Sequence, residues 1–162
     1  IKDAALFAKI AGYADDAALL ADIDSVVATC CAIKARIVEQ DEFDTGLRML
    51  LNFGHTLGHA VEQHFGYSCF THGEGVAIGM YQLTKRTEEL GMTAKGSAER
   101  IKSVLEKYNL PLTAGVEKAQ LLDTMARDKK KNGNSITLII LQQIGEGVLQ
   151  KVDWQEVPKY LG

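Results

Sequence analysis

Histidines are the side chains of this chain whose type and spacing most clearly suggest chemistry. All four, His55, His59, His64 and His72, lie in one short segment, NFGHTLGHAVEQHFGYSCFTHGEGVAIGM. Imidazole nitrogen binds zinc and similar divalent ions well, and imidazole also transfers protons near neutral pH. The segment therefore predicts a metal site or an acid–base site. The alternative is a helical domain whose histidines are simply hydrogen-bonded in its core.

Spacing separates the histidines into a group of three and a fourth that stands apart. His55 and His59 are four residues apart in a predicted helix, which places both rings on one face with Cβ atoms about 5–6 Å apart. His72 begins the next predicted helix, and an antiparallel helix pair would return it to the same place. Catalytic zinc usually takes three protein ligands, so three histidines fit, or two with the third transferring protons. His64 lacks such neighbours, and we expect it at the surface.

Two glycines, Gly54 and Gly58, flank the histidine pair inside the predicted helix. Glycine within a helix costs about 1 kcal/mol relative to alanine. Its presence here predicts the close approach of another backbone or of a ligand. This favours a functional site over the alternative of two helix histidines with ordinary hydrogen bonds.

Polar residues precede the histidines in the same predicted helix, residues 46–65. Arg48 and Asn52 are four residues apart and share the helix face of the histidine pair. The forked donors of Arg48 suit a carboxylate or phosphate, and Asn52 suits a hydroxyl. The alternative for Arg48 is a solvated ion pair with Asp44, four residues earlier.

Lysines add further positive charge. Lys34 lies within the apolar run AIKARIV, and a basic run, RDKKKN, occupies residues 127–132. Such a run is by default a solvated turn, as we expect for Lys129 and Lys131. One of these lysines could reach an anionic ligand as a point charge.

Apolar residues recur at intervals of three and four through the first 110 positions, which contain no proline. This spacing predicts helices over residues 2–13, 15–21, 24–39, 46–65, 73–90, 95–108 and 117–127. The tetrapeptide THGE, from Thr71 to Glu74, matches a capping box that starts the helix after the loop.

The pattern changes near the C-terminus. SITLIILQQ is rich in β-branched residues, and IGEGVLQKV follows it, so residues 135–152 predict a β-hairpin. A short helix is expected within residues 153–161. The predicted fold is therefore mainly α, a compact multi-helix domain over residues 1–162 with a small C-terminal β-hairpin.

Composition excludes several classes of function. A net charge of −3 gives no electrostatic case for binding nucleic acid or an anionic membrane. No apolar run approaches the ~20 residues that span a bilayer. Three cysteines, of which Cys30 and Cys31 are adjacent, are expected to be reduced thiols of a cytoplasmic protein, packed as small apolar residues. The opening IKDAALFAKI lacks Met and already has a helical pattern, which indicates a fragment of something longer.

Three segments resemble the 3-dehydroquinate synthase family: GLRMLLNFGHTLGHAVE, HGEGVAIGM and DKKKNGNSITLIILQQIGE. The resemblance covers essentially the whole chain and implies the helical C-terminal domain of that family. The family also has an N-terminal NAD-binding domain, and nothing in this chain matches it.

The resemblance implies a divalent metal, zinc or cobalt, held by two histidines and a glutamate. His55 and His72 match the two histidine ligands, and His59 matches a residue near the substrate phosphate and the proton-transfer step. The glutamate belongs to a Glu-x-x-Lys pattern whose lysine is Lys2, so it falls two residues before Ile1. The residues that match substrate-binding positions are Lys2, Lys34, Arg48, Asn52 and Lys130.

Asp44 departs from the family pattern, which has glutamate four residues before the arginine. As a shorter carboxylate it is a candidate acid–base residue. It equally suits an N-cap for the helix expected to begin near Gly46.

The activity implied by the resemblance is a carbon–oxygen lyase of the shikimate pathway. It converts 3-deoxy-arabino-heptulosonate 7-phosphate to 3-dehydroquinate and phosphate, with NAD transiently oxidising a substrate hydroxyl. Implied partners are this phosphorylated sugar acid, the protein's own N-terminal NAD-binding domain and a second copy in a homodimer.

Two alternatives remain open from the sequence. One is another sugar-phosphate cyclase of the same superfamily, such as a deoxy-inosose or valiolone synthase. The other is a helical metal-binding or interaction module without catalysis. By itself the chain is expected to be inactive and to bind zinc weakly or not at all, because two histidine ligands do not complete a site.

Overall fold

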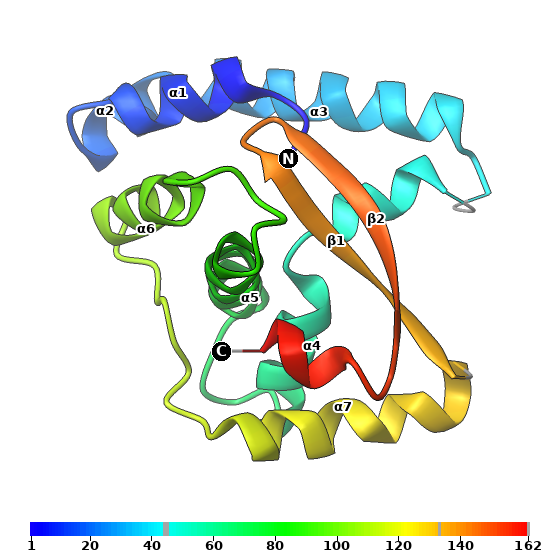
Figure 1. Cartoon of the computed structure of the whole chain (residues 1–162). Helices are drawn as coiled ribbons and strands as arrows, with labels where there is room; N and C mark the ends of the chain where they lie inside the picture. The colour runs from blue at the N-terminus through cyan, green and yellow to red at the C-terminus, as the bar shows by residue number, and fades with distance from the viewer. Residues whose placement is uncertain (44–45, 133, 162) are drawn as a thin grey trace.

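The computed structural model of the chain describes residues 1–43, 46–132 and 134–161, with the side chains of 127–132 excepted. Helices α1 (Ala4–Gly12), α2 (Asp16–Ala21) and α3 (Ile23–Gln40) lie along one edge of the molecule (Figure 1). Aspartates start the first two: Asp3 accepts from the Leu6 N–H at 2.7 Å, and Asp15 from the Ala18 N–H at 2.8 Å. The three helices predicted here are confirmed.

Helix α3 is mostly exposed. Among its residues only Val26 and Ile37 are buried, and Cys30 and Cys31 are exposed free thiols. The prediction that these cysteines pack as small apolar residues is therefore wrong, because α3 contacts the rest of the described chain along a narrow stripe.

The predicted continuous helix over residues 46–65 is wrong. A 3₁₀ helix, η1 (Leu47–Asn52), is separated from α4 (His55–His64) by Phe53 and Gly54. Gly54 has φ +81°, a left-handed conformation that ends helical hydrogen bonding. Arg48 and Asn52 therefore do not share one helix face with the histidine pair.

Helix α5 (His72–Glu89) packs directly on α4 through glycines. A Cβ atom on Gly58 would lie 2.9 Å from the carbonyl carbon and oxygen of Gly75. One on Gly54 would lie 2.6 Å from the Val76 carbonyl oxygen, and one on Gly79 would overlap the Gly54 carbonyl. The close approach predicted from Gly54 and Gly58 is that of the α5 backbone.

The remaining elements are α6 (Ser97–Lys107), α7 (Lys118–Asn132), strands β1 (Ser135–Gln143) and β2 (Glu146–Asp153), and the 3₁₀ helix η2 (Val157–Tyr160). The strands form the predicted antiparallel hairpin, in which Ser135 lies opposite Asp153. Gly145, at φ +95°, lies in the turn between the two strands. Helix α7 continues past its expected end at residue 127.

Strand β1 separates two apolar clusters. Leu138 and Ile140 pack with α4 and α7 side chains, whereas Ile139 and Leu141 pack with Phe53 and with residues of α5 and α6. In Figure 1 the hairpin crosses between the α1–α3 edge and α7. Helix α5 contributes to both clusters, so packing on two sides holds it in place. Among the described residues, no helix has the length and apolarity to cross a membrane.

Candidate functional site

Three imidazoles from two helices meet at the α4–α5 contact. His55 is the first residue of α4, His59 lies one turn later, and His72 is the first residue of α5. Ring centroids are 5.5 Å apart for His55–His59, 5.0 Å for His55–His72 and 5.6 Å for His59–His72. The three histidines that the spacing grouped together do lie together. His64, at the other end of α4, is half-buried and packs its ring on Phe65.

The predicted capping box holds His72 in place. The Glu74 carboxylate accepts from the Thr71 N–H and from the Thr71 hydroxyl, each at 2.8 Å, and the hydroxyl accepts from the Glu74 N–H at 3.4 Å. The hydrogen bond from the Thr71 backbone, then that from its side chain, lowers the pKa of Glu74. These bonds fix the first turn of α5 and hence the backbone of His72.

Replacing Thr71 with alanine is expected to lower the free energy of unfolding by about 1 kcal/mol, because an N-cap acceptor is lost. Urea denaturation followed by circular dichroism measures the change. Thr71→Ser keeps the hydroxyl and should match the original chain. Equal stability of the alanine and serine variants would contradict a structural role for the cap.

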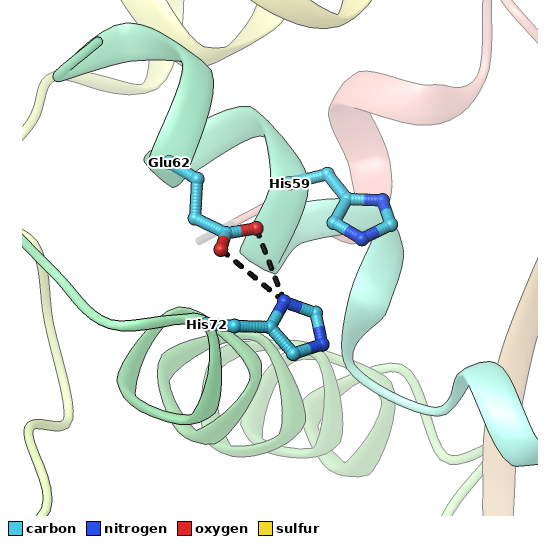
Figure 2. Close-up of side chains that lie close together, drawn as sticks. All are labelled: His59, Glu62 and His72. Atoms are coloured by element: carbon cyan, nitrogen blue, oxygen red, sulfur yellow. Dashed lines mark hydrogen bonds and ion pairs between the residues drawn. The ribbon is translucent and has the colours of Figure 1, made fainter. Parts of the chain in front are cut away.

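A carboxylate that sequence reasoning missed joins the histidines. Glu62 follows His59 by three residues on α4, and its two carboxylate oxygens lie 3.2 and 3.4 Å from Nδ1 of His72 (Figure 2). The Glu62 side chain is 8% exposed and that of His72 is 56% exposed. The signal was present in the sequence, since residues three apart share a helix face.

The site offers two overlapping sets of metal ligands. Donor atoms of His59, Glu62 and His72 all lie within 4.8 Å of one another, which brings together two imidazoles and a carboxylate. The pair implied by the family resemblance is His55 and His72. Nδ1 of His55 lies 3.2 Å from the Phe53 carbonyl oxygen, and a proton there would leave Nε2 available to a metal. Nitrogen and carboxylate donors of this kind suit zinc and cobalt.

A cavity of about 500 Å³ opens beside His59, between α4, α7 and the start of β1. Its polar lining comes from His59, Thr56, Gln63, Ser135 and Thr137. A space of this size with a few polar groups can hold a small polar molecule next to the imidazole.

The predicted substrate-binding residues are more dispersed. Arg48 is half-buried, and its Nη1 donates to the Glu42 carbonyl at 3.0 Å. Asn52, at the end of η1, lines a different cavity from His59. Lys34 is exposed on α3, and Lys2 lines a cavity of about 350 Å³ against α3.

Two predicted residues fall outside what the structure describes. Asp44 is not among the described residues, so its pairing with Arg48 and its acid–base role stay predictions. Lys130 lies in α7, and its side chain is not described.

Residues 1–131 match the family model described as 3-dehydroquinate synthase C-terminal. The chain belongs to this family. It is 45% identical to the 3-dehydroquinate synthase of Clostridium acetobutylicum over 162 residues, 99% of this chain and 46% of that enzyme. It is 36% identical to the 3-dehydroquinate synthase of Enterococcus faecalis, again over 99% of this chain and 45% of the enzyme. The chain thus spans about half the length of these dehydroquinate synthases.

Two solved synthase structures share the fold of this domain. One is 2-epi-5-epi-valiolone synthase from Streptomyces hygroscopicus with NAD⁺ and Zn²⁺ bound, at a TM-score of 0.76 and 20% identity, covering 99% of this chain and 46% of that one. Another is 2-deoxy-scyllo-inosose synthase complexed with carbaglucose-6-phosphate, NAD⁺ and Co²⁺. Its TM-score is 0.70 and its sequence identity is 19%, and the match covers 86% of this chain and 40% of that one.

Proposed function

We propose that this chain is the metal- and substrate-binding part of a 3-dehydroquinate synthase that converts 3-deoxy-arabino-heptulosonate 7-phosphate to 3-dehydroquinate and phosphate. The observation that carries the proposal is the meeting of His55, His59 and His72. It occurs in a chain 45% identical to an enzyme of that name. The solved cyclases are less similar in sequence, at 19–20% identity.

The proposed metal ligands are Nε2 of His55 and of His72, completed by the family glutamate that falls two residues before Ile1. The fit rests on the donor types and on the Phe53 carbonyl beside Nδ1 of His55. A divalent zinc or cobalt ion bound there would polarise a hydroxyl or carbonyl oxygen of the substrate.

His59 is the proposed acid–base residue. It is exposed, it lines the cavity of about 500 Å³, and its ring centroid lies 5.6 Å from that of His72. A proton can therefore pass between a ring nitrogen of His59 and a substrate in the cavity. Asp44 is a proposed second acid–base residue.

The anionic groups of the substrate are the proposed partners of the basic residues. Arg48 offers a planar fork of donors, and Asn52 offers an amide to a hydroxyl. Lys2, Lys34 and Lys130 are proposed as point charges that bind the phosphate and the carboxylate.

The remaining parts of the proposal concern the whole protein. NAD would bind in a separate N-terminal domain, and the related cyclases with bound NAD⁺ support this. A homodimer and a cytoplasmic location are proposed from the family resemblance.

A chimeric enzyme tests the function. The part of the Clostridium acetobutylicum enzyme that precedes the matched region is joined to Ile1 of this chain. Supplied with NAD⁺ and Zn²⁺, the chimera should release phosphate from 3-deoxy-arabino-heptulosonate 7-phosphate. His59→Ala should lower kcat by about 100-fold or more, and His64→Ala should leave it unchanged.

A folded chimera that binds NAD⁺ and releases no phosphate from this substrate would refute the proposal. Release only from a hexose phosphate or a different heptulose phosphate would instead assign the chain to another sugar-phosphate cyclase.

A further inference from the structure

Glu62 is a buried acid with a single side-chain partner among the hydrogen bonds of the described residues, the ring of His72. Buried carboxylates are rare unless they are paired, because removal from water disfavours the charge. Gly75 on α5 leaves room for this side chain, since a Cβ there would lie 3.3 Å from Cγ of Glu62. The packing of α4 on α5 thus encloses the carboxylate and restricts its orientation.

The hydrogen bond determines which nitrogen of His72 is available. An ionised carboxylate only accepts, so this contact is a hydrogen bond when Nδ1 of His72 carries the proton and donates it to Glu62. In the neutral ring, Nε2 then has the lone pair. Figure 2 shows Nδ1 turned toward Glu62, with Nε2 on the far side of the ring.

Distance alone does not separate an orienting partner from a metal ligand. A nitrogen and an oxygen 3.2 Å apart also suit two ligands of one tetrahedral ion, with metal–ligand distances of about 2.0–2.2 Å. We assign the two roles by which side chain is accessible to an ion. The Glu62 side chain is only 8% exposed, whereas the His72 side chain is 56% exposed.

We infer that Glu62 is a positioning residue, whose carboxylate holds the Nδ1–H of His72 and directs Nε2 to the metal. The inference rests on the proposed metal site. Partners of this kind fix the tautomer of a histidine ligand and raise its basicity, and their loss typically costs about 10- to 100-fold in metal affinity.

The first test uses the ¹⁵N-labelled 162-residue chain without metal. Imidazole ¹⁵N shifts and their couplings to ring protons report which nitrogen carries hydrogen. His72 is expected as the Nδ1–H tautomer in the original chain and in Glu62→Gln, whose amide oxygen still accepts. In Glu62→Ala it should shift toward Nε2–H. A predominant Nε2–H tautomer in the original chain would overturn the inference, whatever the protein's function.

The second test titrates Zn²⁺ into the chimeric enzyme, whose N-terminal part supplies the Glu-x-x-Lys glutamate, and into its Glu62 variants, and follows the histidine resonances. Glu62→Gln should weaken the affinity by about 10-fold. An unchanged affinity would overturn the inference. Complete loss of binding while His72 keeps the Nδ1–H tautomer would also overturn it, because Glu62 would then be a metal ligand. Binding of Zn²⁺ away from His55 and His72 would instead refute the proposed metal site. Circular dichroism of each variant monitors folding.

Discussion

Replacing Gly79 with alanine is expected to destabilise the chain by about 3 kcal/mol and to separate α5 from α4. A Cβ at this position would overlap the carbonyl oxygen of Gly54 and lie 3.0 Å from the nitrogen of Gly58. Both obstacles are backbone atoms, which cannot rotate away as a side chain can. Overpacking of this kind typically costs about 1–3 kcal/mol. Urea denaturation measured by circular dichroism gives the change.

Gly73 provides the matched control on the same helix. A Cβ there meets nothing within 4 Å, so Gly73→Ala introduces no clash. Alanine is the better helix former by about 1 kcal/mol, and this variant should be as stable as the original chain or more stable. If both variants lost the same stability, the close contact between helices would not be the cause.

The Gly79 variant also bears on the site. His72 is carried by α5, whereas His55 and His59 are carried by α4. Movement of α5 away from α4 would therefore separate the rings, even though Gly79 lies two turns from His72. The glycines of this contact set the distance between the candidate metal ligands.

Features that depend on neighbours along the chain were predictable from the sequence. The four-residue spacing of His55 and His59 brought their rings together on one helix. The capping box at Thr71 and Glu74 located the start of α5 at His72. The β-branched run before the C-terminus predicted the position of the hairpin.

Features that depend on contacts between distant segments were not predictable in this way. The apolar period runs through Phe53 and Gly54, yet α5 approaches there and the helix is interrupted. The pairing of Glu62 with His72 likewise depends on how α4 and α5 pack. The family resemblance implied substrate-binding roles for Arg48 and the lysines, and these roles stay predictions.

Replacing His72 with alanine is expected to reduce Zn²⁺ affinity by more than about 100-fold, beyond the effect typical of an orienting partner. The proposed site has two histidine ligands in this chain, and the loss of one leaves His55 alone. Zn²⁺ titration of the chain extended to include the Glu-x-x-Lys glutamate, followed by the ¹⁵N resonances of His55 and His59, measures the affinity. The unchanged 162-residue chain is itself expected to bind weakly, and an extension that restores the Glu-x-x-Lys glutamate should strengthen binding.

His64→Ala is the matched control, because His64 lies on α4 but packs on Phe65 rather than on the other histidines. This variant should bind Zn²⁺ as the original chain does. The proposed ligands would be contradicted by a different result: the original chain binds Zn²⁺ tightly and stoichiometrically, and both His59→Ala and Glu62→Gln abolish this binding. It would show that His59, Glu62 and His72, whose donor atoms lie within 4.8 Å of one another, form a complete site without the upstream glutamate.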